Sequence, residues 1–171
     1  DETWPVNPTA LVAWRPKAEQ VILEASSTGV RSIVIRPGIV YGRGGGIPAD
    51  FVKSAQETGT ARYVGTGENH WPLVHVEDLA ELYLLALQHA PAGTLFHATD
   101  GSSYRVREIA EAAGATAESW PLEEARKTLG AYADALALDQ LVSSEKARGT
   151  LGWQPGAISV LEDLRNGSYA P

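Results

Sequence analysis

Short apolar runs alternate with helically spaced apolar positions along this 171-residue chain. Residues 31–36 are β-branched around a continuous apolar centre, a pattern typical of a strand covered on both faces. Residues 17–26 carry apolar side chains at helical spacing, with Pro16 suited to a first turn and Gly29 to a stop. The pattern leaves open whether residues 9–15 form an earlier helical turn that is kinked at Pro16.

The rest of the chain continues this alternation. Further strands are predicted at residues 61–64, 72–76, 94–98 and 118–120, and further helices at 48–58, 77–87, 106–113, 122–129, 131–138, 144–150 and 160–165. The helix at 77–87 is apolar almost all round, so we expect it to be buried on more than one side. Strands that alternate with helices predict an α/β fold, and the many helices after residue 98 are typical of a lid.

Composition and charge exclude several classes of protein. The chain has 14 Lys+Arg against 21 Asp+Glu and a net charge of -7 without a basic stripe, so we expect no nucleic-acid partner. It contains no cysteine, which removes disulfides, thiolate metal sites and thiol nucleophiles and is compatible with a cytoplasmic setting. The apolar runs are far shorter than the ~20 residues that span a bilayer, so we expect no membrane association.

Two candidate chemical sites have simpler interpretations. The glycine run at residues 42–46 matches no phosphate-binding spacing, so a flexible connection that shapes a cleft is favoured. His70 and His75, with the acidic residues that follow, could supply metal ligands, but side chains alternate between faces on an extended segment. We therefore predict no metal site, a position in the core or beside a helix for His75, and a structural role at a helix start for Asp78.

Four segments carry a resemblance to a known family. They are residues 36–42 (Arg-Pro-Gly-Ile-Val-Tyr-Gly), 65–67 (Gly-Thr-Gly), 74–80 (Val-His-Val-Glu-Asp-Leu-Ala) and 151–155 (Leu-Gly-Trp-Gln-Pro), the last after Lys146. In this order and spacing they resemble the C-terminal half of an extended or atypical short-chain dehydrogenase/reductase of the NAD-dependent epimerase/dehydratase family. The resemblance covers nearly the whole chain.

The resemblance implies the C-terminal part of a doubly wound Rossmann-type parallel sheet with a small mixed helical substrate-binding domain. Residues 1–46 would supply the late Rossmann helix, strand and loop, and 47–171 mostly the substrate lid, with 72–98 returning to the sheet. NAD or NADP is the implied cofactor, and its glycine-rich turn belongs to an N-terminal half that this sequence lacks. Because the chain starts at Asp1 without any methionine, we expect a fragment or processed piece. Its implied partner is the missing half or a second polypeptide supplying it.

The family's Tyr-x-x-x-Lys pair implies the catalytic residues. Lys17 takes the place of the lysine that holds the ribose, whereas Ala13 stands where the acid/base tyrosine is expected. This departure leaves Arg15, or a residue of the missing half, to substitute for the tyrosine. The backbone that would face the nicotinamide is that of Pro37, Gly38, Ile39 and Val40.

A second departure concerns the substrate. Sugar-nucleotide members carry an arginine four residues before the histidine of the His-Val-[Asp/Glu]-Asp motif, and here Trp71 stands in that place. The resemblance thus implies an NAD(P)-dependent oxidoreductase or epimerase-like protein that acts on a small carbonyl or hydroxyl substrate rather than a nucleoside-diphosphate sugar. Arg43, His70 and Trp71 are the residues expected in the pocket wall.

Two other interpretations stay open. The absence of the tyrosine at Ala13 is compatible with a non-catalytic NAD(P)-sensing or partner-binding member of the same fold. An independently folded module is the other interpretation, and it requires residues 33–35 to be buried without parallel neighbours. The isolated chain is expected to be catalytically inactive, and its oligomeric state, a homodimer included, is left open.

Overall fold

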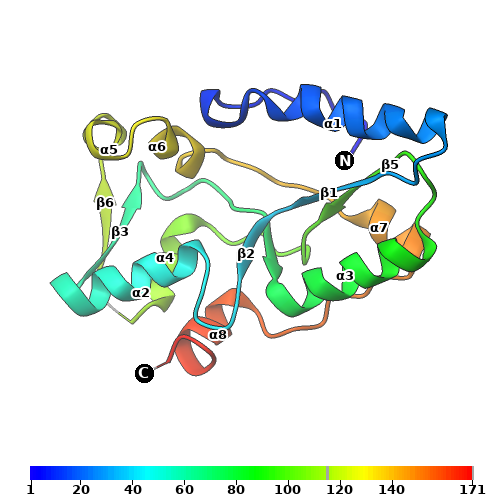
Figure 1. Ribbon diagram of the computed structural model, residues 1–171. Helices are drawn as coiled ribbons and strands as arrows, with labels where there is room; N and C mark the ends of the chain where they lie inside the picture. Colours follow the sequence, from blue (N-terminus) through cyan, green and yellow to red (C-terminus); the bar gives the residue numbers. More distant parts are fainter. Residues whose placement is uncertain (115, 171) are drawn as a thin grey trace.

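The computed structural model describes residues 1–114 and 116–170, which form an α/β architecture (Figure 1). The strands are β1 (Ile33–Pro37), β2 (Ile39–Tyr41), β3 (Thr60–Val64), β4 (Leu73–His75), β5 (Thr94–Ala98) and β6 (Thr116–Trp120). The helices are α1 (Arg15–Glu24), α2 (Ile47–Thr58), α3 (Val76–His89), α4 (Val106–Ala112), α5 (Leu122–Leu129), α6 (Ala131–Leu136), α7 (Glu145–Leu151) and α8 (Val160–Asn166), with 3-10 turns η1 (Ala10–Val12) and η2 (Ala25–Thr28). The pairs are all parallel: β1 with β5, β2 with β4, and β3 with β6.

The structure confirms the α/β alternation and changes some of its details. Each predicted strand and helix overlaps an observed one, although boundaries differ by one to two residues in several places. Residues 10–12 form a separate 3-10 turn, and α1 begins at Arg15, so the question left open before Pro16 is settled. Strand β2 was not predicted, because it has only three residues and follows a glycine bend directly.

Gly38 lets one extended segment belong to two strand pairs. Its N–H donates to the Ala98 carbonyl at 2.9 Å, and the next N–H, from Ile39, donates to the Pro72 carbonyl at 2.7 Å. A Cβ at position 38 would lie 2.5 Å from the Pro72 oxygen, so only glycine fits against this backbone. The chain therefore leaves β5 and joins β4 at this residue.

One face of β1 and β5 is covered by α3 and α7. Ile33 and Ile35 point to this face, where they pack with Phe96, Leu82 and Trp153 in a continuous apolar cluster. The Trp153 indole Nε1 donates to the Asp78 carbonyl at 2.8 Å, and the Asp78 carboxylate accepts the backbone N–H groups of Gly156 and Ala157. The predicted structural role of Asp78 at a helix start agrees with these contacts.

Helix α3 is less buried than its sequence suggested. Tyr83, Leu84 and Leu87 are 51%, 59% and 68% exposed, so the expectation of burial on more than one side holds only toward the sheet and α7. The reason is that no element among the described residues covers the outer flank of this helix. Within that part of the chain, no helix is both long and apolar enough to cross a membrane.

Helix α1 lies on the opposite side of β1 from α3 (Figure 1). Its contact with the strand includes a charged pair in which the Arg36 Nε donates to the Glu19 carboxylate at 3.0 Å. No residue of α1 is buried, and Val21 and Ile22 remain 62% and 45% exposed. This face of the sheet is thus only partly covered.

The second part of the molecule is built from α2, β3, β6, α4 and α8 around its own apolar cluster. The C-terminal segment secures the glycine loop at residues 42–46, because the Tyr169 hydroxyl donates to the Gly45 carbonyl and accepts the Gly42 N–H. Ser168 Oγ accepts the Gly44 N–H at 3.0 Å. The loop that the sequence suggested as a flexible connection is therefore held by three hydrogen bonds to the side chains of Ser168 and Tyr169.

Candidate functional site

The carboxyl ends of β1 and β5 lie side by side and define the candidate site. Pro37 and Ala98, the last residues of these strands, are paired, and Pro37 is exposed. In open α/β sheets, ligands bind outside the carboxyl ends of the strands. A residue that contacts a cofactor is therefore expected near this edge.

The start of α1 lies at this edge. Glu19 sits in the second turn of α1 and holds Arg36, the residue before Pro37, so the first turn of α1 is placed beside the carboxyl end of β1. Arg15 and Lys17 are both exposed there, and neither forms an ion pair within residues 1–114 and 116–170. Ala13 is exposed just before them.

Residues 69–72 form the next wall of the site. Asn69 Nδ2 donates to the carbonyls of Leu136 and Leu138 at 3.1 and 3.0 Å, and so satisfies acceptors at the end of α6. Helix α6 also contacts η1, just ahead of α1. Because Pro72 contacts Gly38, this segment runs from α6 to the end of β1.

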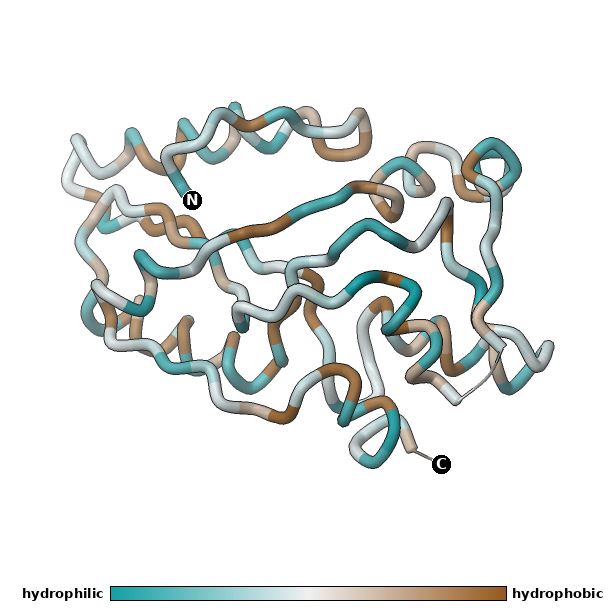
Figure 2. The backbone as a smooth tube through the Cα atoms, turned by 180° about the vertical axis from the view of Figure 1, so that it is seen from behind, coloured by the Kyte–Doolittle hydropathy of each residue, from teal (hydrophilic) through white to brown (hydrophobic). Residues whose placement is uncertain are grey.

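The segment that joins α6 to α7 closes the edge over β5. Seen from behind, it crosses the middle of the molecule (Figure 2). Thr99 Oγ1 donates to the Val142 carbonyl at 2.9 Å, and Ser144 Oγ donates to the Thr99 carbonyl at 2.8 Å. A cavity of about 350 Å³ opens next to this crossing, lined by Gly101, Ser102, Ser103, Leu141, Val142, Ser143, Ser144, Glu145 and Arg148.

His70 forms a close pair with Asp139 on this crossing segment. The ring Nδ1 lies 2.8 Å from Asp139 Oδ1, and the His70 backbone N–H donates to the same oxygen at 2.8 Å. The backbone N–H of His70, and then its ring, lower the pKa of the Asp139 carboxyl because both hydrogen bonds favour the charged form. Sequence reasoning missed Asp139, since no motif links positions 70 and 139.

Of the other two residues expected in the pocket wall, Trp71 turns its side chain into the core and Arg43 lies on the surface. Trp71 is 3% exposed and stacks on Phe51 with ring centroids 5.9 Å apart, inside the core of the second part of the molecule. Arg43 has a 75% exposed side chain and pairs with Glu77 at 3.0 Å. Arg43 has a left-handed φ of 53°. No contact among the described residues joins Arg43 or Trp71 to Lys17, so their role toward a substrate stays a prediction.

The residues predicted to face a nicotinamide are only partly free. Pro37 is exposed, whereas Gly38, Ile39 and Val40 are half-buried. The N–H groups of Gly38 and Ile39 are already used by protein carbonyls, so they are not free to bind a ligand. At this edge the chain offers the exposed surface of Pro37, and Lys17 is exposed in the first turn of α1.

A buried polar cluster beside β2 has a structural role. Tyr41 donates to the Ile158 carbonyl at 2.9 Å, and burial raises the pKa of its phenol, which keeps the hydroxyl protonated. His75 is 5% exposed, accepts the Glu77 N–H on Nδ1 and lies 4.0 Å from the Asp163 carboxylate. The predicted place of His75, in the core at a helix start, is confirmed. No group of side chains able to hold a metal ion occurs in the part of the chain that the structure describes.

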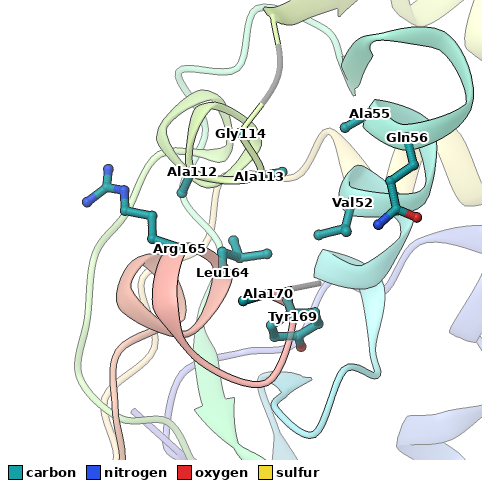
Figure 3. Close-up of a pocket in the computed structure, with 10 residues that line it drawn as sticks. All are labelled: Val52, Ala55, Gln56, Ala112, Ala113, Gly114, Leu164, Arg165, Tyr169 and Ala170. Carbon is teal, nitrogen blue, oxygen red and sulfur yellow. The ribbon is translucent and has the colours of Figure 1, made fainter.

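A second cavity lies away from the candidate site. It has about 400 Å³ and is bounded by α2, α4 and α8 (Figure 3). Its lining consists of Val52, Ala55, Gln56, Ala112, Ala113, Gly114, Leu164, Arg165, Tyr169 and Ala170. None of the site residues predicted from the sequence reaches it.

Comparison with known proteins supports the family resemblance. Residues 17–98 match the NAD dependent epimerase/dehydratase family. The match confirms the resemblance over this segment. An uncharacterised protein of Schizosaccharomyces pombe is 33% identical over 162 residues, which cover 91% of this chain and 55% of that protein.

Two further relatives extend the comparison. A protein of Stigmatella aurantiaca named 4-hydroxy-2-methyl-3-oxo-4-farnesyl-3,4-dihydroquinoline-1-oxide ketoreductase is 29% identical over 97 residues, 57% of this chain and 29% of that protein. The solved structure of RMD from Pseudomonas aeruginosa complexed with NADPH is 19% identical with a TM-score of 0.73, and the match covers 99% of this chain and 57% of that one. This likeness confirms the fold of a Rossmann-type α/β protein. The chain spans about half the length of the curated relatives that match most of it.

Proposed function

We propose that this chain is the C-terminal part of an NAD(P)-dependent oxidoreductase or epimerase-like protein that acts on a small carbonyl or hydroxyl substrate. The observation that carries the proposal is the arrangement at the carboxyl edge of β1 and β5. There the Glu19–Arg36 pair holds α1, the helix that carries Lys17, against β1, and the Pro72 carbonyl accepts the Ile39 N–H just after Pro37. Residues 1–46 and 72–98 then belong to the cofactor-binding sheet, and most of 47–171 to the substrate lid.

The residues present fit one end of a dinucleotide. Lys17 carries three N–H donors without an acidic partner among the described residues, which suits the hydroxyl groups of a ribose. The exposed Pro37 offers an apolar surface for the nicotinamide ring. When bound, the cofactor would accept or supply a hydride. The chain's own residues hold the ring and the ribose, and the sequence has no glycine-rich turn for the pyrophosphate.

The unpaired edge of β1 and the exposed apolar side chains of α1 support an N-terminal half as the partner of this chain. Among the described residues, β1 pairs with β5 alone, so its other edge has backbone groups free to join a further strand. Val21 and Ile22 on α1 lie exposed on the same side of the molecule as this unfinished face. A folded N-terminal half, or a second polypeptide, would pair with that edge and cover these side chains.

The substrate proposal rests on position 71. An arginine there would present a bidentate cation to a diphosphate, but the Trp71 ring is packed against Phe51 and offers no charge. The named ketoreductase of Stigmatella aurantiaca supports a carbonyl substrate with an aromatic ring. We therefore place a small, weakly charged carbonyl or hydroxyl compound at this site.

The test begins with the protein from its native source. Intact masses measured under denaturing conditions show whether a longer chain or a second polypeptide is present, and fluorescence titration of the same sample with NADPH measures binding. We expect a glycine-rich half and NADPH binding that is weakened at least tenfold by Lys17→Ala. The exposed Lys127 on α5 provides the matched control, and Lys127→Ala should bind NADPH as the wild type does. Tight NADPH binding to the 171-residue chain alone contradicts the proposal.

A second candidate function is favoured by Ala13. A non-catalytic NAD(P)-sensing or partner-binding member needs the fold and Lys17 but not the tyrosine that Ala13 replaces. NADPH binding without turnover of any compound in a panel of small aldehydes, ketones and secondary alcohols favours this alternative. Slow turnover that Lys17→Ala abolishes favours the enzyme.

A further inference from the structure

The site lacks an obvious group to move a proton. Ala13 has no titratable side chain, and the Arg15 guanidinium stays charged at any physiological pH, so it can stabilise an anion but cannot act as a base. If the proposed function is right, another residue at the carboxyl edge of β1 and β5 has to exchange a proton with the substrate oxygen.

His70 is held in the manner expected of such a residue. Asp139 Oδ1 lies 2.8 Å from the ring Nδ1 and also accepts the backbone N–H of His70, so both the ring and its own backbone are tied to one carboxylate oxygen. A carboxylate on Nδ1 selects the Nδ1–H tautomer and leaves a lone pair on Nε2. Nε2 makes no hydrogen bond within residues 1–114 and 116–170, and the side chain is 25% exposed.

The pair lies between the elements that build the site. His70 is two residues before Pro72, which contacts the Gly38 bend, and Asp139 lies on the segment that crosses the end of β5. Helix α6, which leads into Asp139, contacts η1 just ahead of Ala13. Helix α6 therefore connects the position left without a tyrosine to the segment that holds the histidine.

We propose, on the basis of the proposed function, that His70 is the acid/base residue of this site and that Asp139 is its positioning residue. In the oxidising direction Nε2 would take the hydroxyl proton of the substrate as the carbinol C–H bond breaks, and a bound NAD(P)+ would supply the two-electron acceptor for the hydride. The C=O double bond forms, and His70 becomes an imidazolium stabilised by Asp139. In the reducing direction Nε2 returns its proton to the oxygen.

The charged surroundings of His70 are simple. Asp139 faces the ring from the crossing segment. On the other side, Arg105 forms an isolated backbone bridge with His70, and its guanidinium pairs with Glu68 at 3.2 Å. Glu68 also pairs with Arg107 at 2.9 Å, and Asp139 is the carboxylate in contact with the imidazole.

The first test needs no activity. Ring-nitrogen NMR on the 171-residue chain at neutral pH should show His70 in the Nδ1–H tautomer, and Asp139→Ala should shift it toward the Nε2–H tautomer preferred by the side chain of free histidine. His89, exposed on α3, is the internal reference and should be unaffected by the substitution. A His70 ring that matches His89 in the wild type overturns the proposal whether or not the protein is an enzyme.

The second test uses the longer protein with NADPH and the panel of small carbonyl compounds. We expect His70→Ala to lower kcat about 100-fold with little change in NADPH binding, and added imidazole to restore part of the loss. His89→Ala should leave kcat unchanged. Full activity in His70→Ala overturns the role of His70 while the proposed function stands. NADPH binding without any turnover by the wild type overturns both.

Discussion

Helices α1 and α3 pack against the same strand from opposite sides but use their side chains differently. Helix α3 buries Leu79, Leu82 and Ala86 against the sheet, whereas no residue of α1 is buried. What ties α1 to β1 is largely the charged pair of Arg36 and Glu19. The difference shows that one face of β1 is a finished apolar core and the other still has apolar surface to cover.

The largest expected effect lies in the finished core. Trp153 is fully buried, and its indole donates to the Asp78 carbonyl. Trp153→Ala should lower the free energy of unfolding by about 3–5 kcal/mol, because it opens a cavity and leaves a buried carbonyl without its partner. Urea denaturation measures the loss. Trp153→Phe, which keeps most of the packing, should cost clearly less, and equal losses for the two variants would contradict the assignment.

A matched pair of substitutions compares the two helices directly. Leu82→Ala on α3 should cost about 2–5 kcal/mol because Leu82 is fully buried. Ile22→Ala on α1 should change stability by less than about 0.5 kcal/mol in the isolated chain, since Ile22 is 45% exposed. In a protein that carries the proposed N-terminal half, the cost of Ile22→Ala should rise. Equal costs for both variants in the isolated chain would remove the distinction between the two faces.

Breaking the ion pair of Arg36 and Glu19 should have an intermediate effect on the free energy of unfolding. The side chains of Arg36 and Glu19 are 27% and 17% exposed, so solvent screens part of their attraction. Arg36→Gln should cost about 1 kcal/mol and speed amide hydrogen exchange in α1 without changing exchange in α3. Exchange that speeds up equally in both helices would mean that the pair supports the whole sheet rather than α1.

The smallest effect should appear as a pH dependence on the α1 side. Burial lowers the pKa of His97, which lies beside Arg36, against an opposing attraction from Glu2. The ordinary pKa of a histidine is about 6.5, and the fold favours the neutral form of His97. Its contribution to the free energy of unfolding is therefore complete above that pH and is lost as the pH falls toward the folded-state pKa. Thermal unfolding between about pH 7 and pH 5 should show a small decrease in Tm that His97→Gln removes. An unchanged decrease in the variant would assign it to another group.

Elements with a local pattern were predictable. The apolar centre at residues 33–35 and the capping signals around α1 and α3 depend on neighbours in the sequence, and each overlaps the observed element. The short strand β2 and the exposed flank of α3 were not predictable in this way. The first depends on the contact of Gly38 with Pro72, and the second on what does or does not cover a helix.

In the candidate site, too, some residues could be found from local motifs and others could not. Lys17 and Pro37 came from a motif, and their role toward a cofactor stays a prediction. His70 was expected in the pocket wall without its partner. Asp139 had no signal, because it meets His70 across 69 positions of sequence. Trp71 was expected at the pocket, yet its ring lies in the core against Phe51, a contact that no local pattern reveals.

By itself, the sequence determined the alternation of strands and helices, the family resemblance and the absence of cysteine chemistry, because these depend on residue type and local spacing. Only the tertiary structure decided which side chains meet. The pairing of His70 with Asp139, the burial of Trp71 and the open edge of β1 all come from segments far apart in the chain. Such contacts form when apolar surface is buried across the whole fold, and periodicity along a sequence does not encode which distant segment provides the partner.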